Sequence, residues 1–217
     1  MTFKNRILGA LSGLIISFLI VSSSLLGGAS SFSEPQKQVC PVDSLLFEEG
    51  DILLRRGNSF ISTMIVKAFP NGGGMSHCGI LFNVDGSWQV LHSISGQISD
   101  TEGIRMEPFK SFVFHAKDYD VKHIKPLFEV KRDVMKEESL KLLRQKVGFD
   151  HDFDLDNTQK MYCSELVRAV YFAGGEQDPF LYKRIAGKSL IDMASFFWID
   201  MWQETQHNNA SKHGLSL

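Results

Sequence analysis

Cys163 is the first residue in the sequence that could carry out covalent chemistry. It stands at the predicted start of a helix whose apolar face includes Leu166, Val167 and Val170. Unpaired N–H groups and the positive end of the helix dipole stabilise a thiolate at such a position. A partly ionised cysteine can act as a nucleophile in acyl transfer. A buried structural cysteine is the alternative, because free cysteine is among the most buried residue types.

Two histidines could serve this nucleophile as a base and an orienting partner. His77 follows a glycine-rich loop at the start of a predicted strand, and His92 ends the next predicted strand. Asp85-Gly86 predicts a two-residue hairpin turn between them, which places Gly79 opposite His92. Both histidines then lie on one sheet face as diagonal neighbours, roughly 7–8 Å apart at the backbone. A longer loop would put His92 on the other face, and a hydrogen-bonded sheet histidine is the alternative role for each.

Neither of two conceivable metal sites satisfies its ligand rules. Residues 152–163 begin like a calcium loop, but the sixth position is Asn157 rather than Gly and the twelfth is Cys163 rather than Glu. A zinc site would draw on His77, His92, His151 and Cys163. It lacks a short ligand spacing such as H-x-x-x-H or C-x-x-C and is the weaker alternative. We therefore predict no metal and no cofactor.

The elements that must position these residues indicate an α+β protein. Strands are predicted over residues 50–55, 77–82 and 88–92, with a further pair over 109–115 and 119–126. Helices are predicted over 59–69 and 133–147 and from 163 to 175, with a last amphipathic segment over 189–202. Asp133 is expected to cap the second helix and Gly148 to end it. This order predicts a small antiparallel sheet with packed helices.

The N-terminal segment predicts export. Lys4 and Arg6 precede an uncharged stretch with an apolar core over residues 7–26, and small residues follow it. This pattern is typical of a signal peptide over residues 1–29. The apolar core is also about 30 Å long as a helix, so an uncleaved anchor that associates with the membrane is the alternative. Both readings place the remaining chain in the periplasm or facing the cell exterior.

Composition and charge narrow the function class. The 217 residues carry 23 Lys+Arg and 25 Asp+Glu, a net charge of −2 without a basic block, which argues against nucleic-acid binding. Residues 30–45 predict a linker, 46–202 one domain and 203–217 a flexible tail. With three cysteines at most one disulfide can form, and Cys78 is expected to pack inside or to pair with Cys40. No oligomeric state is predicted.

Four stretches of the chain carry a family resemblance when they are taken together. They are Gly50-Asp51-Ile52-Leu53, Ser76-His77-Cys78-Gly79-Ile80, residues 148–154 and Met161-Tyr162-Cys163-Ser164-Glu165-Leu166-Val167. In this order the chain resembles the permuted papain-like amidases of the YaeF/YiiX type, which are relatives of the NlpC-type cell-wall peptidases. The resemblance covers roughly residues 46–200.

The resemblance implies a circularly permuted papain-like (NlpC-like) fold, with a small β-barrel-like antiparallel sheet. It implies Cys163 as the nucleophile and His77 as the general base. The third position, where the family commonly has Glu, is His92, and Tyr162 is expected to line the cleft. We expect an exported cysteine hydrolase that cleaves an amide bond through a thioester.

The expected substrate is a peptide or an acyl-amide, with peptidoglycan peptide the natural class for an exported enzyme. One alternative is acyl chemistry on lipids or lipoproteins, which the related lecithin–retinol acyltransferase-like proteins suggest because they share the permuted order. The other is a non-catalytic binding module, in which His92 would mark a decayed triad.

Overall fold

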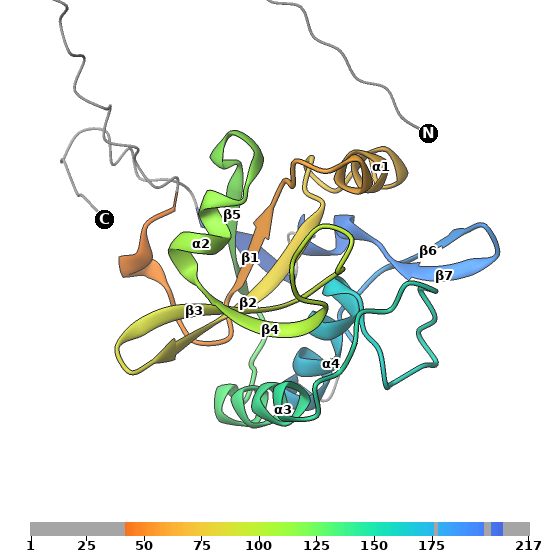
Figure 1. Cartoon of the computed structure of the whole chain (residues 1–217). Coiled ribbons are helices and arrows are strands. Elements are labelled where there is room, and N and C mark those ends of the chain that lie inside the picture. The colour runs from red at the N-terminus through yellow and green to blue at the C-terminus, as the bar shows by residue number, and fades with distance from the viewer. Residues whose placement is uncertain (1–41, 176–177, 198–200, 206–217) are drawn as a thin grey trace, which may run out of the picture. The chain divides into compact units, whose positions relative to one another are not determined.

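The computed structural model describes residues 42–175, 178–197 and 201–205 (Figure 1). The predicted leader, Cys40 and most of the predicted linker and tail lie outside these ranges. Within them, no helix is both long enough and apolar enough to cross a membrane. Val42, which falls in the predicted linker, is buried beside Phe47 in the core of the domain.

The centre of the domain is an antiparallel sheet of six strands in the order β4-β3-β2-β1-β5-β8. Its strands are β1 (Ile52–Arg55), β2 (His77–Val84), β3 (Ser87–Ile94), β4 (Gly103–Pro108), β5 (Val121–Pro126) and β8 (Trp202–Glu204). A separate two-stranded sheet consists of β6 (Tyr182–Ile185) and β7 (Lys188–Ile191). The antiparallel α+β class predicted from the sequence is confirmed.

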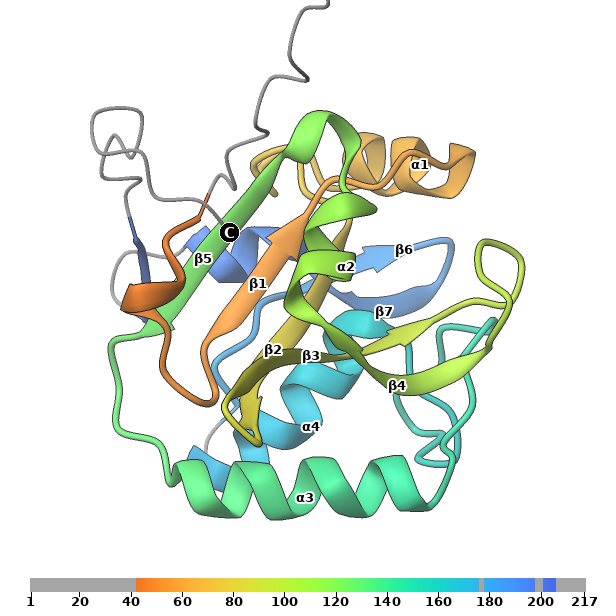
Figure 2. The ribbon, with the colours of Figure 1, turned by 60° about the vertical axis from the view of Figure 1, so that its left-hand side comes forward.

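Four α-helices are described around this sheet. They are α1 (Phe60–Ala68), α2 (Phe109–Phe114), α3 (Arg132–Arg144) and α4 (Cys163–Gly175). Three short 3₁₀ helices, η1 (Ser44–Leu46), η2 (Lys117–Tyr119) and η3 (Met193–Phe197), join the other elements. In Figure 2, α2 lies in front of the sheet, whereas α4 lies on its opposite side with α3 beside it.

The sheet has two different faces because side chains alternate along a strand. Ile80 belongs to one face and packs in a core with Leu166 of α4. Leu81 and Val90 belong to the other face and pack in a smaller core with Phe112 of α2. The catalytic candidates His77 and His92 follow the alternation of Leu81 and Val90, so they lie on the α2 side of the sheet.

The β2–β3 hairpin has the predicted register. Val84 pairs with Ser87 across Asp85 and Gly86, whose φ angles of 50° and 79° are the positive values that a type I′ turn requires. Ile80 pairs with Leu91, and one further step of this register brings Gly79 opposite His92. The prediction that the two histidines share a face is therefore confirmed.

The segment after this hairpin differs from the prediction. Residues 109–115 were expected to be a strand, but they form α2, because Phe109, Phe112 and Val113 are buried at a helical spacing. Strand β4, which directly precedes this helix and which the prediction did not include, pairs with β3. The predicted strand over 119–126 is β5, and it pairs with β1 and β8 rather than with residues 109–115. The following strand begins at Val121 rather than at Tyr119, which belongs to η2.

Two later elements also differ from the prediction. Helix α3 begins after Lys131 without a side-chain cap, and its last turn gives way to Lys146, whose φ is 53°, before Gly148 is reached. The amphipathic segment over 189–202 is divided between β7, η3 and the start of β8. Gln203 and Glu204, which were expected to begin the flexible tail, continue β8, and Glu204 pairs with Ile124 of β5.

Candidate active site

A cavity of about 1330 Å³ brings together three of the four predicted site residues. His77 at the start of β2, Cys163 at the start of α4 and Tyr162 directly before it all line this cavity. The Tyr162 hydroxyl accepts a hydrogen bond from the backbone N–H of Ile191 at 3.2 Å, which ties β7 to the cavity wall. His92 is fully buried behind His77. Tyr162 thus lies in the cavity wall, and its contact with a substrate stays a prediction.

Cys163 is a free, buried thiol at the N-terminus of α4, at the margin of the core that Leu166 and Cys78 share. A hydrogen bond with the side chain of Cys78 lowers the pKa of Cys163, while burial acts in the opposite direction. Backbone hydrogen bonds from Cys78, Ser164 and Cys163 itself lower this pKa further, so the net shift favours the thiolate. Burial raises the pKa of the Cys78 thiol well above its usual value, which keeps Cys78 protonated as the donor.

Cys78 is a buried free cysteine, so one of its two predicted environments, a packed position inside the domain, is confirmed. Its contact with Cys163 attaches the start of α4 to β2 at the residue next to His77, although the Cys78 and His77 side chains point to opposite faces of the sheet. Among the described residues no hydrogen bond joins Cys163 to His77 themselves. Catalytic hydrogen bonds in enzymes without substrate are often long and tighten only on binding. The structure therefore brings the two side chains to one cavity.

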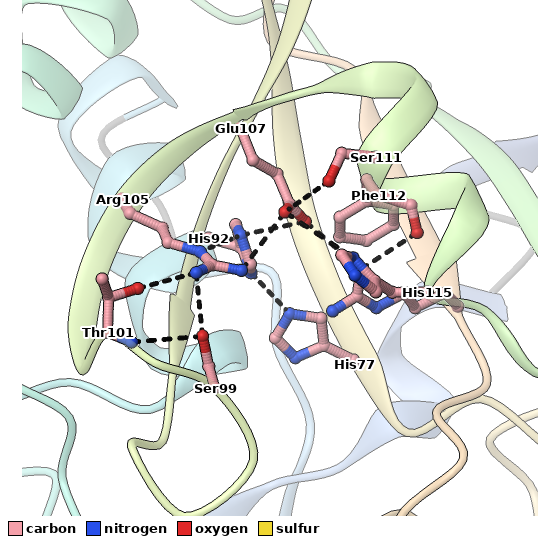
Figure 3. Close-up of polar contacts among 10 residues, drawn as sticks. His77, His92, Ser99, Thr101, Arg105, Glu107, Ser111, Phe112 and His115 are labelled. Carbon is pink, nitrogen blue, oxygen red and sulfur yellow. Dashed lines mark hydrogen bonds and ion pairs between the residues drawn. The ribbon is translucent and has the colours of Figure 1, made fainter.

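The two histidines are in direct contact. Nε2 of His77 lies 2.8 Å from Nδ1 of His92, a hydrogen bond that Figure 3 shows at the centre of the polar network. The His77 ring is also stacked on Phe112 of α2, with 5.8 Å between ring centroids. Burial lowers the pKa of both histidines, and the charges of Arg55 and Arg105 lower the pKa of His77 further. Both imidazoles are therefore neutral near neutral pH.

Glu107 completes this network and was not predicted. One of its carboxylate oxygens, Oε1, lies 3.2 Å from Nε2 of His92. Burial alone would raise the pKa of Glu107, but His92, Arg55 and Arg105 outweigh it and lower the pKa to about 2. A full negative charge therefore stands behind the two histidines (Figure 3).

The register of β4 explains why Glu107 reaches His92. Arg105 pairs directly with His92 and Glu107 pairs with Val90, so all lie on one face. Glu107 and His92 are diagonal neighbours, a spacing that long side chains can bridge. The sequence does contain a signal for this strand, because apolar Ile104 and Met106 alternate with Arg105 and Glu107.

The acidic loop after α3 forms a wall of the cavity. Asp150 is buried and accepts backbone N–H groups from Asp152 and Asp154, at 2.8 and 2.5 Å. This turn directs Phe149 and Phe153 to the cavity lining. The loop is thus a turn built around Asp150, which shapes the cleft.

Glu165, in the first turn of α4, provides a test of the electrostatics around Cys163. It is 3% exposed and accepts the backbone N–H of Tyr162 at 3.3 Å, and burial raises its pKa from 4.5 to about 8. Between these two values the unfolded chain loses a proton that the folded protein keeps, so stability falls as the pH rises. Glu165→Gln cannot ionise. In urea unfolding, this variant is expected to lack the decline of about 2–3 kcal/mol that the native protein shows between pH 5 and pH 8.

The matched control for this test is Glu137→Gln, which changes an exposed glutamate on α3. Its effect is expected to stay within about 0.5 kcal/mol at both pH values. Parallel pH profiles for the native protein and the Glu165 variant would show that Glu165 is ionised in the folded state.

The fold and the site together define the class of protein. A histidine strand of an antiparallel sheet precedes, in the chain, a helix that begins with cysteine, and both residues open into one cavity. This is the arrangement of a papain-like cysteine hydrolase with permuted chain order. The chain belongs to the permuted papain-like amidase family, YaeF/YiiX, C92, which it matches over residues 47–199.

A solved structure supports the fold. The chain is similar to a crystal structure described as metalloprotein yiiX from Escherichia coli O157:H7, with a TM-score of 0.62 and 15% identity. The similarity covers 73% of this chain and 96% of that chain. No match was found among the curated proteins.

The residues of this chain do not form a metal site where they are described. Within those ranges, no group of three or more His, Cys, Asp or Glu side chains is arranged to hold a metal ion. Among the four residues considered as zinc ligands, Nε2 of His77 is hydrogen-bonded to His92, and His151 pairs with Glu102 at 3.1 Å. We therefore derive no step through a metal.

Proposed function

We propose that this protein is an exported cysteine hydrolase that cleaves an amide bond through a thioester on Cys163. The observation that carries the proposal is the shared cavity of Cys163 and His77, with His77 backed by His92 and Glu107. Membership of an amidase family supports the type of bond. Support for export comes from the leader sequence over residues 1–29.

In the proposed first half-reaction, Nδ1 of His77 takes the proton of the Cys163 thiol, and the sulfur attacks the carbonyl carbon of the amide. The carbonyl oxygen becomes an oxyanion, which the backbone N–H of Cys163 at the start of α4 can stabilise. When the tetrahedral intermediate collapses, the C–N bond breaks and the His77 imidazolium gives its proton to the leaving amine. The product is an acyl thioester on Cys163.

In the second half-reaction, neutral His77 takes a proton from water, and the hydroxide oxygen attacks the thioester carbonyl. The C–S bond breaks, the carboxylic acid leaves, and the proton returns from His77 to the sulfur. The lowered pKa of His77 suits this role, because the neutral base is the dominant form near neutral pH.

The cavity lining favours acyl chemistry on lipids or lipoproteins as a second candidate function. Several large apolar side chains of the lining are also strongly exposed, including Phe60 (78%), Phe114 (69%) and Met64 (50%). Exposed apolar residues grouped around one cavity are typical of a binding surface rather than of an ordinary protein surface. They suit an apolar acyl chain better than a polar peptide.

One experiment tests both candidates. The protein is incubated separately with muropeptides, with N-acyl amides of short and long chains, and with phospholipid vesicles, and the mass of Cys163 peptides is then followed by mass spectrometry. We expect an acyl adduct on Cys163 and release of an amine, with long-chain amides reacting faster than short ones. If only phospholipid gives an adduct, the result favours a lipid acyl hydrolase or acyltransferase. If only muropeptides are cleaved, the result favours a cell-wall peptidase. No adduct and no product from any substrate would count for the non-catalytic module.

A further inference from the structure

We propose that Glu107 is a positioning residue that sets the tautomer of His77 through His92. The inference rests on the proposed function, because it concerns which form of His77 faces Cys163. It adds a fourth member to the predicted set of Cys163, His77 and His92. Glu107 lies on β4, one strand further from His77 of β2 than His92 of β3, the third residue predicted from the sequence.

Two side chains compete for the same nitrogen of His92. Nε2 of His92 lies within ion-pair distance of the Glu107 carboxylate oxygen Oε1, at 3.2 Å, and it accepts a hydrogen bond from Nε of Arg105, also at 3.2 Å. Ionised Glu107 can only accept a hydrogen bond from this nitrogen, whereas Arg105 can only donate a hydrogen bond to it. The two contacts therefore demand opposite tautomers of the neutral His92 ring.

The tautomer of His92 determines that of His77. If Nε2 of His92 donates to Glu107, then Nδ1 of His92 is bare and accepts the Nε2–H of His77. Nδ1 of His77 then keeps its lone pair for the thiol proton. If Nε2 of His92 accepts from Arg105 instead, both rings reverse, and His77 carries its proton on Nδ1. With a proton already on Nδ1, His77 cannot accept the proton of the Cys163 thiol at this nitrogen.

The surroundings of Glu107 hold it in position as the acceptor. Arg55 Nη1 and Arg105 Nη2 contact its two oxygens at 3.3 and 3.2 Å, and the Ser111 hydroxyl donates at 3.2 Å. The same Arg55 nitrogen donates to the backbone carbonyl of Phe112 at 2.9 Å. Since these donors keep Glu107 ionised, its carboxylate can accept a hydrogen bond from His92 at the 3.2 Å contact, and it offsets the charge that His77 gains in each half-reaction.

Arg105 is likewise held by other partners. Its Nη1 donates to the hydroxyls of Ser99 and Thr101 at 2.8 and 2.6 Å, and its Nη2 donates to Glu107 (Figure 3). The guanidinium can therefore remain bound when its Nε does not donate to His92. The Arg105 side chain is also 27% exposed, so its Nε–H can turn to solvent. The Glu107 side chain is only 8% exposed, and without the His92 N–H its oxygen would face the lone pair of a buried ring. This asymmetry favours the form in which Glu107 accepts a hydrogen bond from the Nε2–H of His92.

The first test is ¹⁵N NMR of the imidazole nitrogens in the full chain, which reads the tautomer of each neutral histidine without a substrate. In the native protein we expect both His77 and His92 to carry their proton on Nε2. In Glu107→Gln, the amide can donate to His92, and His77 is expected to change to the Nδ1–H form. A native spectrum with His77 protonated on Nδ1 would overturn the proposal, even if the variant fails to fold.

The second test is the rate at which iodoacetamide alkylates Cys163, mapped by mass spectrometry across a pH series. Glu107→Gln is expected to slow alkylation near pH 7 at least about tenfold, which corresponds to a rise of one unit in the apparent pKa. Glu107→Asp, which keeps the charge, is expected to recover part of the rate. An unchanged profile in Glu107→Gln would count against the proposal.

Asp51→Asn is the matched control for both tests. Asp51 and His123 form another buried carboxylate–histidine pair on the same sheet, at 2.7 Å, and neither lines the cavity. This variant loses a comparable buried contact and is expected to leave the His77 tautomer and the Cys163 alkylation profile unchanged. Equal changes in both variants would assign Glu107 a structural role only. Since neither readout involves amide turnover, failure here is distinguishable from failure of the proposed hydrolase activity.

Discussion

Replacing Cys163 with serine is expected to lower kcat/KM for an amide substrate by at least about 10³-fold and to leave the fold intact. The hydroxyl of serine has a much higher pKa than a thiol, so the hydrogen bonds that favour the Cys163 thiolate cannot produce an alkoxide. The measurement is steady-state hydrolysis of a long-chain N-acyl amide, with circular dichroism as the check on folding.

Cys78→Ala is the informative comparison for this variant. It removes the thiol that bonds to Cys163, so the pKa of Cys163 is expected to rise and the loss of activity to be partial, recovering as the pH increases. Retention of activity by the Cys163 variant, or an acyl adduct mapped to Cys78, would show that the nucleophile has been misassigned.

Replacing Gly79 with alanine is expected to destabilise the domain by about 1–3 kcal/mol. The variant is also expected to lose most of the amide-hydrolysing activity of the native protein. A Cβ atom at this position would lie 2.5 Å from Val90 Cγ1, 2.8 Å from the backbone oxygen of Leu91 and 3.1 Å from His92 Cβ. Strands β2 and β3 would have to separate there. His92 would then move away from His77, because the two rings are carried by these strands.

The matched control is Gly148→Ala, where the nearest atom to the new Cβ, Lys160 Cγ, would lie at an ordinary 3.8 Å. This change is expected to alter the free energy of unfolding by no more than about 0.5 kcal/mol, measured by urea denaturation of both variants. If Gly79→Ala proved as mild as the control, the close packing of the histidine strands would not be what sets the His77–His92 distance.

Local sequence rules predicted the part of the site that depends on neighbouring residues. The Asp85-Gly86 turn fixed the register of β2 and β3, and this register alone placed His77 and His92 on one face. The helical spacing after Cys163 located the start of α4, and the family resemblance then selected Cys163 and His77 as the pair to bring together. Each of these inferences uses contacts that a turn or a helix imposes over a few residues.

The segment over residues 103–115 shows where such rules fail. The apolar residues at 109, 112 and 113 favour a helix, yet the aromatic content of the segment also favours a strand, and the prediction followed the latter. As a result, the strand that carries Arg105 and Glu107 was missed. A short strand is selected by the partner with which it pairs, and residues 95–102 separate β4 from its partner β3, so no two-residue turn specifies this pairing.

The sequence by itself therefore determined the α+β class, the β2–β3 register and a histidine strand followed by a cysteine helix. Only the tertiary structure decided that His92 lies between His77 and the Glu107 carboxylate, so that the row of polar side chains behind Cys163 ends at Glu107 rather than at His92. The reason is that Glu107, Arg55 and Phe112 come from separate elements, and no turn or helix fixes their distances. Those distances follow from strand pairing and helix packing across the whole sheet.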